Sequence, residues 1–303
     1  MMMWEAKDNP RGAGAPRVSI GLPVYNGQAY LATAMDSLLA QTYRDFELIV
    51  CDNASTDGTE GICRKYAKQD CRVRYVRQVH NVGAAGNFNR TAELARGEYF
   101  RWAAHDDVCG PTLLERCVEA LDANPQAVLA HGQVAIIDHA GQVIATPDGN
   151  GMANLLDPAR EMESADPARR FYELLLRTKW CFEIFGLIRK QVLMRTRLHE
   201  PFYGSDKVIL ATLCLSGAFV TVPQVLFYRR YHPDSSTSLK DSTQRNAWIG
   251  GGKSQKSARL QCLGGYARAI READMPSWTR VRCLGVLGKY VGQFQKWRWP
   301  LAS

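Results

Sequence analysis

The sequence lacks three features, and each absence excludes a class of protein. None of its apolar runs reaches the roughly 18 uncharged residues that a membrane-spanning helix needs. The segment 1–16 is mixed and interrupted by glycine and proline, without the apolar core of a secretory signal peptide. The nine cysteines include no Cys-x-x-Cys pair, so we expect neither a disulfide framework nor a structural zinc site. We therefore expect a soluble, globular, cytoplasmic protein.

Positive charge is concentrated near the C-terminal end. The segment 240–303 holds twelve Lys and Arg residues against three acids, a surplus of nine. The whole chain carries +8, so residues 1–239 sum to −1. Such a segment favours an anionic membrane surface, a phosphate-bearing substrate or nucleic acid as a partner. We expect no nucleic acid, because no recognition motif accompanies the charge.

The N-terminal part of the chain alternates short apolar runs with helical patterns. Strands are expected at 18–24, 46–51, 73–79, 99–103 and 127–132, with helices between them. This alternation predicts an α/β fold with a mostly parallel central sheet and helices on both faces. Ligands of such sheets bind beyond the carboxyl ends of the strands. Polar residues stand at four of those ends: Asn26, Asp52, Asn81 and the pair Asp106–Asp107.

After residue 132 the alternation weakens. The patterns predict a hairpin, two helices and two short strands, at 134–145, 167–177, 206–215, 219–222 and 226–229. Loops are expected at 146–165 and at 234–257, the second being a loose connection rich in Ser, Gly and Lys.

Two blocks of sequence carry a recognisable pattern: SIGLPVYNGQAYLATAMDSLLAQTYRDFELIVCDNASTDGT (19–59) and HNVGAAGNFNRTAELARGEYFRWAAHDD (80–107). They resemble family 2 glycosyltransferases with the GT-A fold, and the likeness covers about 17–235. It implies a GT-A catalytic domain there, with a donor-binding half at 17–132 and an acceptor and base half at 133–235. A flexible terminus at 1–16 and a basic helical segment at 236–303 would flank this domain.

The resemblance implies a metal-dependent site after the fourth strand. Asp106 matches the last position of the family's Asp-x-Asp element and would bind Mn²⁺ or Mg²⁺, which take carboxylates together with substrate phosphates. Asp107 and His105 are assigned to donor binding. The family's first Asp falls on Ala104, which puts the usual ribose contact in doubt. The alternative is that Asp106 and Asp107 cap the helix near Pro111, and that His105 is structural.

The remaining donor residues come from three strand ends. Pro23, Tyr25 and Asn26 match the family's first donor loop, and Asp52 matches its contact to the nucleobase. Alternatively, Tyr25 is a core residue and Asp52 forms an Asx turn. A further block matches the family's Asn-x-Gly element, where the glycine would permit close approach of the donor and Asn87 would bind it or organise the helix start: Asn81, Gly83 and Asn87.

The second half is expected to supply the base. Asp206, at the head of an apolar helix, resembles the family's acidic motif and would take the proton of the acceptor hydroxyl; the alternative is a helix N-cap. A late element resembles the family's Arg and His positions, with the arginines on donor phosphates and His232 on the metal: Arg229, Arg230 and His232. Trp180 and Glu183 fall where this fold places its acceptor surface, although core packing is an alternative for Trp180.

The segment 277–298 has amphipathic helical spacing with basic flanks. Its apolar positions are Trp278, Val281, Leu284, Leu287, Val291, Phe294 and Trp297. One hypothesis places this helix on the anionic inner face of a membrane, next to a lipid-linked acceptor. The alternative is a helix that packs its apolar face on the catalytic domain.

These observations predict an inverting glycosyltransferase. It would move a sugar from a nucleotide-diphosphate donor, UDP as a first guess, to an acceptor hydroxyl in polysaccharide, glycolipid or glycosylated-metabolite biosynthesis. Two alternatives stay open. A sugar-phosphate nucleotidyltransferase usually has an N-terminal Gly-rich loop where this chain has LPVYNG. A non-catalytic nucleotide-sugar-binding module is kept open by Ala104.

Overall fold

The computed structural model describes residues 14–147, 149, 156–157, 160–233, 235, 239, 241–250 and 257–293. Most of the predicted flexible terminus, residues 1–13, lies outside this described part. The same holds for positions 294–298 of the predicted C-terminal helix.

In the described residues, nine strands form one mixed sheet in the order β3-β2-β1-β4-β8-β6-β9-β5, with β7 beside β6. Their bounds are β1 Val18–Val24, β2 Phe46–Asp52, β3 Val73–Arg77, β4 Tyr99–Trp102, β5 Val108–Cys109, β6 Ala127–Ile137, β7 Val143–Ala145, β8 Leu187–Arg189 and β9 Ala218–Arg230. The first four strands run parallel, as do β6 and β9. The other pairs, which involve β5, β7 and β8, are antiparallel.

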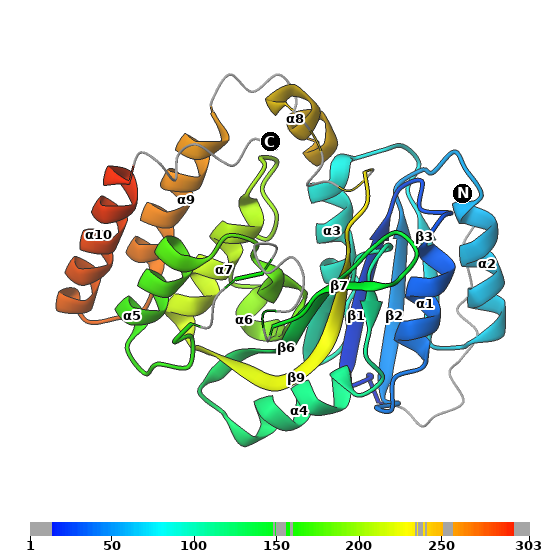
Figure 1. The fold of residues 1–303 in the computed structure, drawn as a ribbon, viewed down its shortest axis with the longest axis horizontal. Helices are drawn as coiled ribbons and strands as arrows, with labels where there is room; N and C mark the ends of the chain where they lie inside the picture. Colours follow the sequence, from blue (N-terminus) through cyan, green and yellow to red (C-terminus); the bar gives the residue numbers. More distant parts are fainter. Residues whose placement is uncertain are drawn as a thin grey trace.

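Helices cover both faces of this sheet (Figure 1), which confirms the predicted α/β class. One apolar core joins the sheet to α1 (Leu31–Leu39), α2 (Thr59–Gln69) and α4 (Leu113–Ala123). A second core joins it to α3 (Gly83–Glu93), α5 (Pro167–Tyr172), α7 (Ser205–Ser216), α9 (Ala258–Glu272) and α10 (Ser277–Gly292). β1 and β2 are buried along their whole length, as near-continuous apolar strands of a covered parallel sheet should be.

The second half differs from its predicted pattern in two places. The two short strands expected at 219–222 and 226–229 are one strand, β9, whose register against β6 shifts between Val222 and Val225. Pro223 lies at this shift, and a residue without a backbone N–H is tolerated at such an irregularity. The predicted loose connection at 234–257 contains a helix, α8 (Ser242–Ile249), which Asp241 caps by accepting a hydrogen bond from the Gln244 N–H at 2.8 Å.

Shorter elements complete the second half. The predicted helix at 167–177 begins as α5 and ends in a π-helical turn, η2 (Glu173–Arg177). A 3-10 helix, η3 (Phe182–Phe185), precedes β8, and α6 (Lys190–Leu193) follows it. The described residues contain no helix that is both long and apolar enough to span a bilayer.

Candidate active site

The loops after β1 and β2 are tied to each other by hydrogen bonds. Asn26 has a positive φ of 51°, a conformation that Asn tolerates better than most residues. Its Oδ1 accepts a bond from the Thr56 N–H at 2.8 Å, and its own N–H donates to the Ser55 hydroxyl at 2.9 Å. Pro23 is buried within β1, whereas the Tyr25 side chain is 44% exposed at the end of the strand. The protein's own bonds therefore hold the loop that presents Tyr25.

Asp52 lies fully buried at the end of β2. Its Oδ1 accepts a hydrogen bond from the Ser55 N–H, and its Oδ2 accepts one from the Tyr75 hydroxyl, both at 2.8 Å. The Arg77 guanidinium lies 3.4 Å from Oδ2. The carboxylate thus performs the Asx-turn role and fixes the same loop. Its predicted contact with the nucleobase stays a prediction.

The loop after β3 is held by Asn53, which directly follows Asp52 and is not among the predicted site residues. The Asn53 amide donates to Asn81 Oδ1 at 2.9 Å and accepts from the Val82 N–H at 2.9 Å. Gly83 has φ +78°, and a Cβ added there would come within 2.3 Å of the Gly250 Cα at the end of α8. In this structure the backbone that approaches Gly83 closely is therefore that of Gly250.

Asn87 is buried in α3 and faces the sheet. Its amide nitrogen donates to the backbone carbonyls of Cys51 at 2.7 Å and Val24 at 3.4 Å. One side chain thereby joins α3 to the carboxyl ends of β1 and β2, where the loops after those two strands begin.

Asp106 and His232 meet although 126 residues separate them in the chain. Asp106 follows β4, His232 follows β9, and the His232 Nε2 lies 3.0 Å from Asp106 Oδ2. The Tyr30 ring also packs against His232, with ring centroids 4.9 Å apart. Burial by itself raises the pKa of Asp106, but the hydrogen bond with His232 and the nearby His105 outweigh it and lower that pKa below its ordinary value.

The neighbouring Asp107 has a different role. It is buried, and its Oδ1 accepts a hydrogen bond from the Arg230 N–H at 2.8 Å. Burial and then the charge of Asp106 raise the pKa of Asp107. The Arg230 guanidinium donates to the Asp106 carbonyl at 2.8 Å and the Asp138 carbonyl at 2.9 Å. Arg230 thus holds the backbone that carries Asp106. Helix α4 has Thr112 as its N-cap residue and no side-chain cap, so neither aspartate caps it.

Asp206 occupies the first turn of α7. The N-cap residue is Gly204, with φ 95°, and no side chain caps the helix, so the N-cap alternative for Asp206 does not apply. The carboxylate accepts a hydrogen bond from the Lys207 N–H at 2.8 Å. Burial raises the pKa of Asp206, although this bond and the charge of Lys207 act in the opposite direction.

The predicted acceptor residues lie on the segment before β8. The rings of Trp180 and Phe182 are parallel, with centroids 6.3 Å apart, and the Arg229 guanidinium lies 5.9 Å from the centre of the Phe182 ring. Arg229 and Arg230 therefore point to different neighbours, as successive residues of a strand do. Glu183 is buried and forms an ion pair with Arg160.

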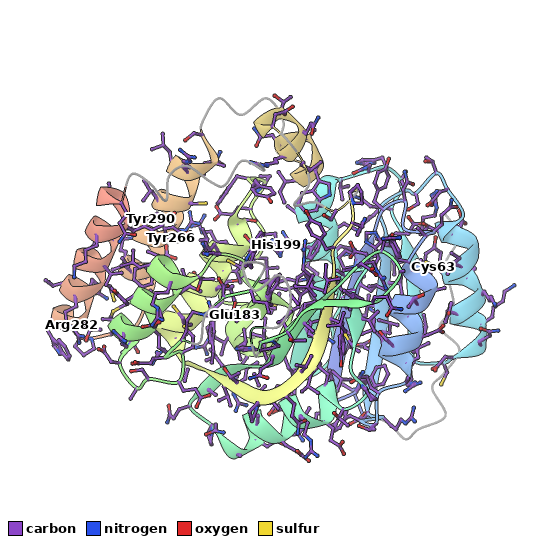
Figure 2. The ribbon with its side chains drawn as sticks, viewed as in Figure 1. Cys63, Glu183, His199, Tyr266, Arg282 and Tyr290 are labelled. Carbon is purple, nitrogen blue, oxygen red and sulfur yellow. The ribbon has the colours of Figure 1, made fainter. Side chains whose placement is uncertain are left out.

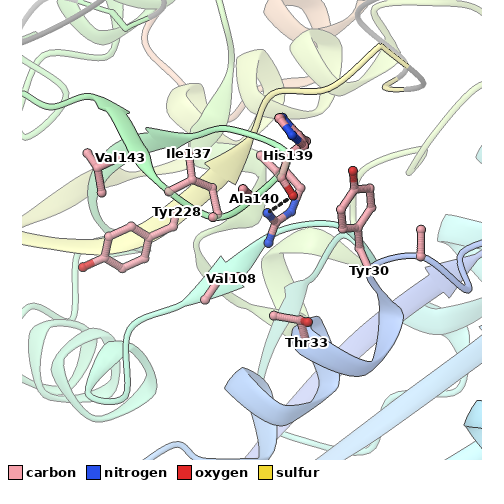
Figure 3. A pocket seen from close by; sticks show the side chains of 11 residues that line it. Tyr30, Thr33, Val108, Ile137, His139, Ala140, Val143 and Tyr228 are labelled. Atoms are coloured by element: carbon pink, nitrogen blue, oxygen red, sulfur yellow. Dashed lines mark hydrogen bonds between the residues drawn. The ribbon is translucent and has the colours of Figure 1, made fainter.

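A pocket of about 510 Å³ lies between the start of α1 and the β6–β7 hairpin (Figure 3). Tyr30 and Thr33 line it on one side, and the β6–β7 hairpin, including Ile137 and His139, lines it on the other. Tyr30 links this pocket to the Asp106–His232 pair, because its ring centroid lies 4.9 Å from that of His232.

A family model described as "Glycosyl transferase family 2" matches residues 19–198, more than half of the chain. The chain belongs to glycosyl transferase family 2. Membership confirms the predicted family and the broad class of the enzyme, a transferase of sugars.

Two relatives show how far this family 2 glycosyltransferase resembles curated proteins. It is 27% identical over 236 residues to a Campylobacter jejuni protein named "GalNAc(5)-diNAcBac-PP-undecaprenol beta-1,3-glucosyltransferase", covering 78% of this chain and 72% of that protein. It is 36% identical over 142 residues to an uncharacterized glycosyltransferase of Rickettsia felis. That match covers 46% of this chain but only 23% of the Rickettsia protein.

Solved structures confirm the GT-A fold. The S. aureus TarS structure in complex with UDP has a TM-score of 0.65 at 15% identity, and the match covers 92% of this chain and 72% of the TarS chain. The mannosyltransferase PcManGT from Pyrobaculum calidifontis, in complex with GDP-Man and Mn²⁺, has a TM-score of 0.54 at 17% identity. That match covers 96% of this chain and 79% of the mannosyltransferase.

Sequence reasoning missed several residues of this family 2 site. Asn53 could have been found from the sequence, because it is a polar amide beside Asp52 at the end of a predicted strand. Nothing in the sequence marks Tyr30 or Gly250 as a site residue. Tyr30 falls between the strands expected at 18–24 and 46–51, and Gly250 falls in the segment predicted to be a loose connection.

Proposed function

We propose that this protein is an inverting glycosyltransferase that moves a sugar from a nucleotide diphosphate to an acceptor hydroxyl. The observation that carries the proposal is the Asp106–His232 pair, 3.0 Å apart, at the edge of the sheet where the loops after β1, β2 and β3 gather. Of the two alternatives, neither the nucleotidyltransferase nor the binding module gains an observation in its favour.

The donor site would comprise the exposed Tyr25 and the loops fixed by Asn26, Asp52, Asn81 and Asn87. Gly83, His105 and Asp107 would complete it, and Arg229 is the better placed arginine for donor phosphates because carbonyl groups occupy the Arg230 guanidinium. UDP is the first candidate nucleotide. The likeness to TarS supports it, because TarS structures are described as complexes with UDP and UDP-GlcNAc.

A divalent cation fits the donor set of this site. Among the described residues no group of three or more His, Cys, Asp or Glu side chains is placed to hold a metal ion. Asp106 and His232 offer one oxygen and one nitrogen, and Mg²⁺ is often held by one or two carboxylates together with substrate phosphates. When bound, Mn²⁺ or Mg²⁺ would neutralise charge on the diphosphate leaving group. The lowered pKa of Asp106 keeps its carboxylate ionised for such a role.

Asp206 would act as the general base. Burial raises the pKa of Asp206, so its carboxylate accepts a proton more readily than an exposed one. It would take the proton of the acceptor hydroxyl as that oxygen forms a bond to the anomeric carbon. The bond from that carbon to the diphosphate oxygen breaks on the opposite face, so the configuration inverts.

The acceptor would lie against the segment with Trp180, whose ring stacks with Phe182, and Glu183, which is held by Arg160. A lipid-linked acceptor is supported by the relative from Campylobacter jejuni, whose name specifies an undecaprenol-linked substrate. The reaction would then belong to polysaccharide or glycolipid assembly at the cytoplasmic face of a membrane, with glycosylated metabolites as the other acceptor class. Residues 17–132 would form the donor half and 133–235 the acceptor half.

A thermal-shift screen of UDP, GDP, dTDP and CDP, each with and without Mn²⁺, tests the donor site. A nucleotide at about a hundred times its Kd stabilises the folded state by about 2.7 kcal/mol, a shift of several degrees in Tm. We expect UDP to give this shift with Mn²⁺ and a smaller one without it. Asp45→Asn, an exposed aspartate at the start of β2, is the control and should respond like the wild type. A flat response to all four nucleotides would contradict the proposal.

A further inference from the structure

The apolar stripe of the C-terminal helix faces away from the protein. Trp278, Val281 and Leu284 are 62%, 66% and 50% exposed. Val291, two turns further along α10, is 42% exposed. Side chains at this spacing lie on one side of a helix, so α10 presents these four apolar side chains outward. We call these four side chains the α10 stripe.

A different face of α10 joins the core. Thr279, Cys283 and Val286 are buried, and the helix packs against α5 and α9. Tyr290 meets Tyr266 of α9 edge to face, with ring centroids 5.7 Å apart (Figure 2). The helix therefore packs on the protein, as one sequence hypothesis held, but the α10 stripe takes no part in that packing.

Positive charge borders the α10 stripe. Arg282 and Lys289 flank the stripe and the helix contains no acidic residue, whereas its third cation, Arg280, donates to the carbonyls of Ile270 and Ala273 at the end of α9. The Arg282 guanidinium lies 5.2 Å from the centre of the Trp278 ring and pairs with Asp166 at 2.6 Å. The sequence beyond the described residues continues this composition, with no acid and with further aromatic and basic residues: Phe294, Lys296, Trp297, Arg298 and Trp299.

We propose that α10 lies on an anionic lipid surface, with the α10 stripe in the interfacial region and its cations at the headgroups. Apolar residues including Trp, flanked by Lys and Arg, are the composition of helices that lie in a membrane interface. A second copy of the chain fits less well, because two α10 helices face to face would bring the two Lys289 ammonium groups to one interface, with no acidic residue on either helix to offset them.

The position of α10 suits this role. It forms the outer edge of the helical layer, with α9 and α5 between it and the rest of the molecule (Figure 1). A flat surface against α10 therefore leaves the loops after β1 and β2 accessible. The surface does not depend on the proposed chemistry, so it can fail or hold independently of the transferase assignment.

Co-sedimentation of the full chain with vesicles tests the proposal. One set of vesicles is phosphatidylcholine alone, and the other contains about one-third phosphatidylglycerol. We expect binding to the anionic vesicles that falls as salt rises through about 0.15 M, where charges are screened beyond about 8 Å. The double variant Val281→Glu/Leu284→Glu should lower the partition coefficient by at least about tenfold, and Lys289→Glu should lower it by about tenfold.

Matched variants control for charge and folding. Met194→Glu alters an exposed apolar side chain on another element, and Lys68→Glu reverses an exposed cation in the last turn of α2. Both should bind vesicles like the wild type. The far-UV circular dichroism spectrum and the Tm without ligand should be the same in all variants, which shows that they fold. Wild-type protein that ignores anionic vesicles, or α10 variants that bind as well as their controls, would overturn the proposal. So would a dimer of the wild type that the double variant dissociates, since the α10 stripe would then be an interface between copies.

Discussion

The two aspartates that carry the proposed chemistry lie in opposite environments. Asp106 is held by groups from remote parts of the chain, with His232 on its carboxylate and Arg230 on its carbonyl. Asp206 sits in the first turn of its own helix, and the bond it accepts comes from the next residue, Lys207. The loops after β1, β2 and β3 are likewise joined by hydrogen bonds between residues far apart in the chain. The pKa of Asp206, by contrast, is shifted mainly by burial.

Their pKa values shift in opposite directions as a result. The imidazoles beside Asp106 lower its pKa, whereas burial raises that of Asp206. A pair of titratable groups driven apart by their environments is the usual way to divide roles between two carboxylates. The lowered pKa of Asp106 suits a metal ligand that stays ionised. The raised pKa of Asp206 suits a general base. The predictions that follow test this division.

The largest effect is expected from Asp206→Asn. The amide keeps the size of the side chain but cannot accept the proton, so kcat should fall by about 10²- to 10⁴-fold. The Kd for UDP with Mn²⁺ should not change. Steady-state kinetics and nucleotide titration measure the two quantities. Normal turnover by Asp206→Asn would show that Asp206 is not the base. The opposite pKa shifts of Asp106 and Asp206 would then have no catalytic role.

Asp106→Asn should produce the reverse pattern. Loss of the anionic oxygen beside His232 should weaken UDP binding in the presence of Mn²⁺ by at least about tenfold, or about 1.4 kcal/mol. Binding without metal should stay the same. Titration of UDP with and without Mn²⁺ measures this, with Asp45→Asn as the control. An equal loss in both conditions would mean that Asp106 contacts the nucleotide or shapes the loop without holding a metal.

Gly83→Ala tests the long-range contacts of the donor side. The new Cβ would lie 2.3 Å from the Gly250 Cα in a backbone conformation with φ +78°, so we expect a loss of about 1–3 kcal/mol of stability. UDP affinity should fall as well, because Gly83 bonds to the Asn81 side chain through its N–H at 2.8 Å. Gly61→Ala in α2 is the matched control. No atom lies within 4 Å of its added Cβ, and it should be neutral or stabilise slightly. Chemical denaturation compares the two variants.

The smallest effect concerns stability and pH. Because burial raises the folded-state pKa of Asp206 above its unfolded value, the ionised carboxylate destabilises the fold at pH above both values. This penalty disappears as pH falls below the unfolded-state value. Asp206→Asn should therefore raise the free energy of unfolding, and with it Tm, at neutral pH, and the gain should vanish in acid. Tm measured across pH checks it. A variant less stable than the wild type at neutral pH would show that the carboxylate is stabilising.

Local pattern was sufficient to predict most of the donor half. Apolar runs bounded by turn residues placed β1, β2, β3 and β4, and the motif blocks placed polar residues at their carboxyl ends. These patterns can be recognised in a single sequence because a buried strand and the loop after it are each one short, contiguous stretch of chain. The second half was harder, since β9 continues past Pro223 where local signals indicate a break.

The sequence by itself determined the fold class, the family and the residues that gather at the strand ends. Only the tertiary structure decided how those residues are used. Arg229 and Arg230 are adjacent and chemically identical, yet one lies over Phe182 and the other holds the Asp106 loop. The apolar positions of α10 were visible as a pattern, but the face that packs is the one with Cys283 and Val286. Periodicity reveals that a helix has faces, and only the shape of the surface it meets decides which face is buried.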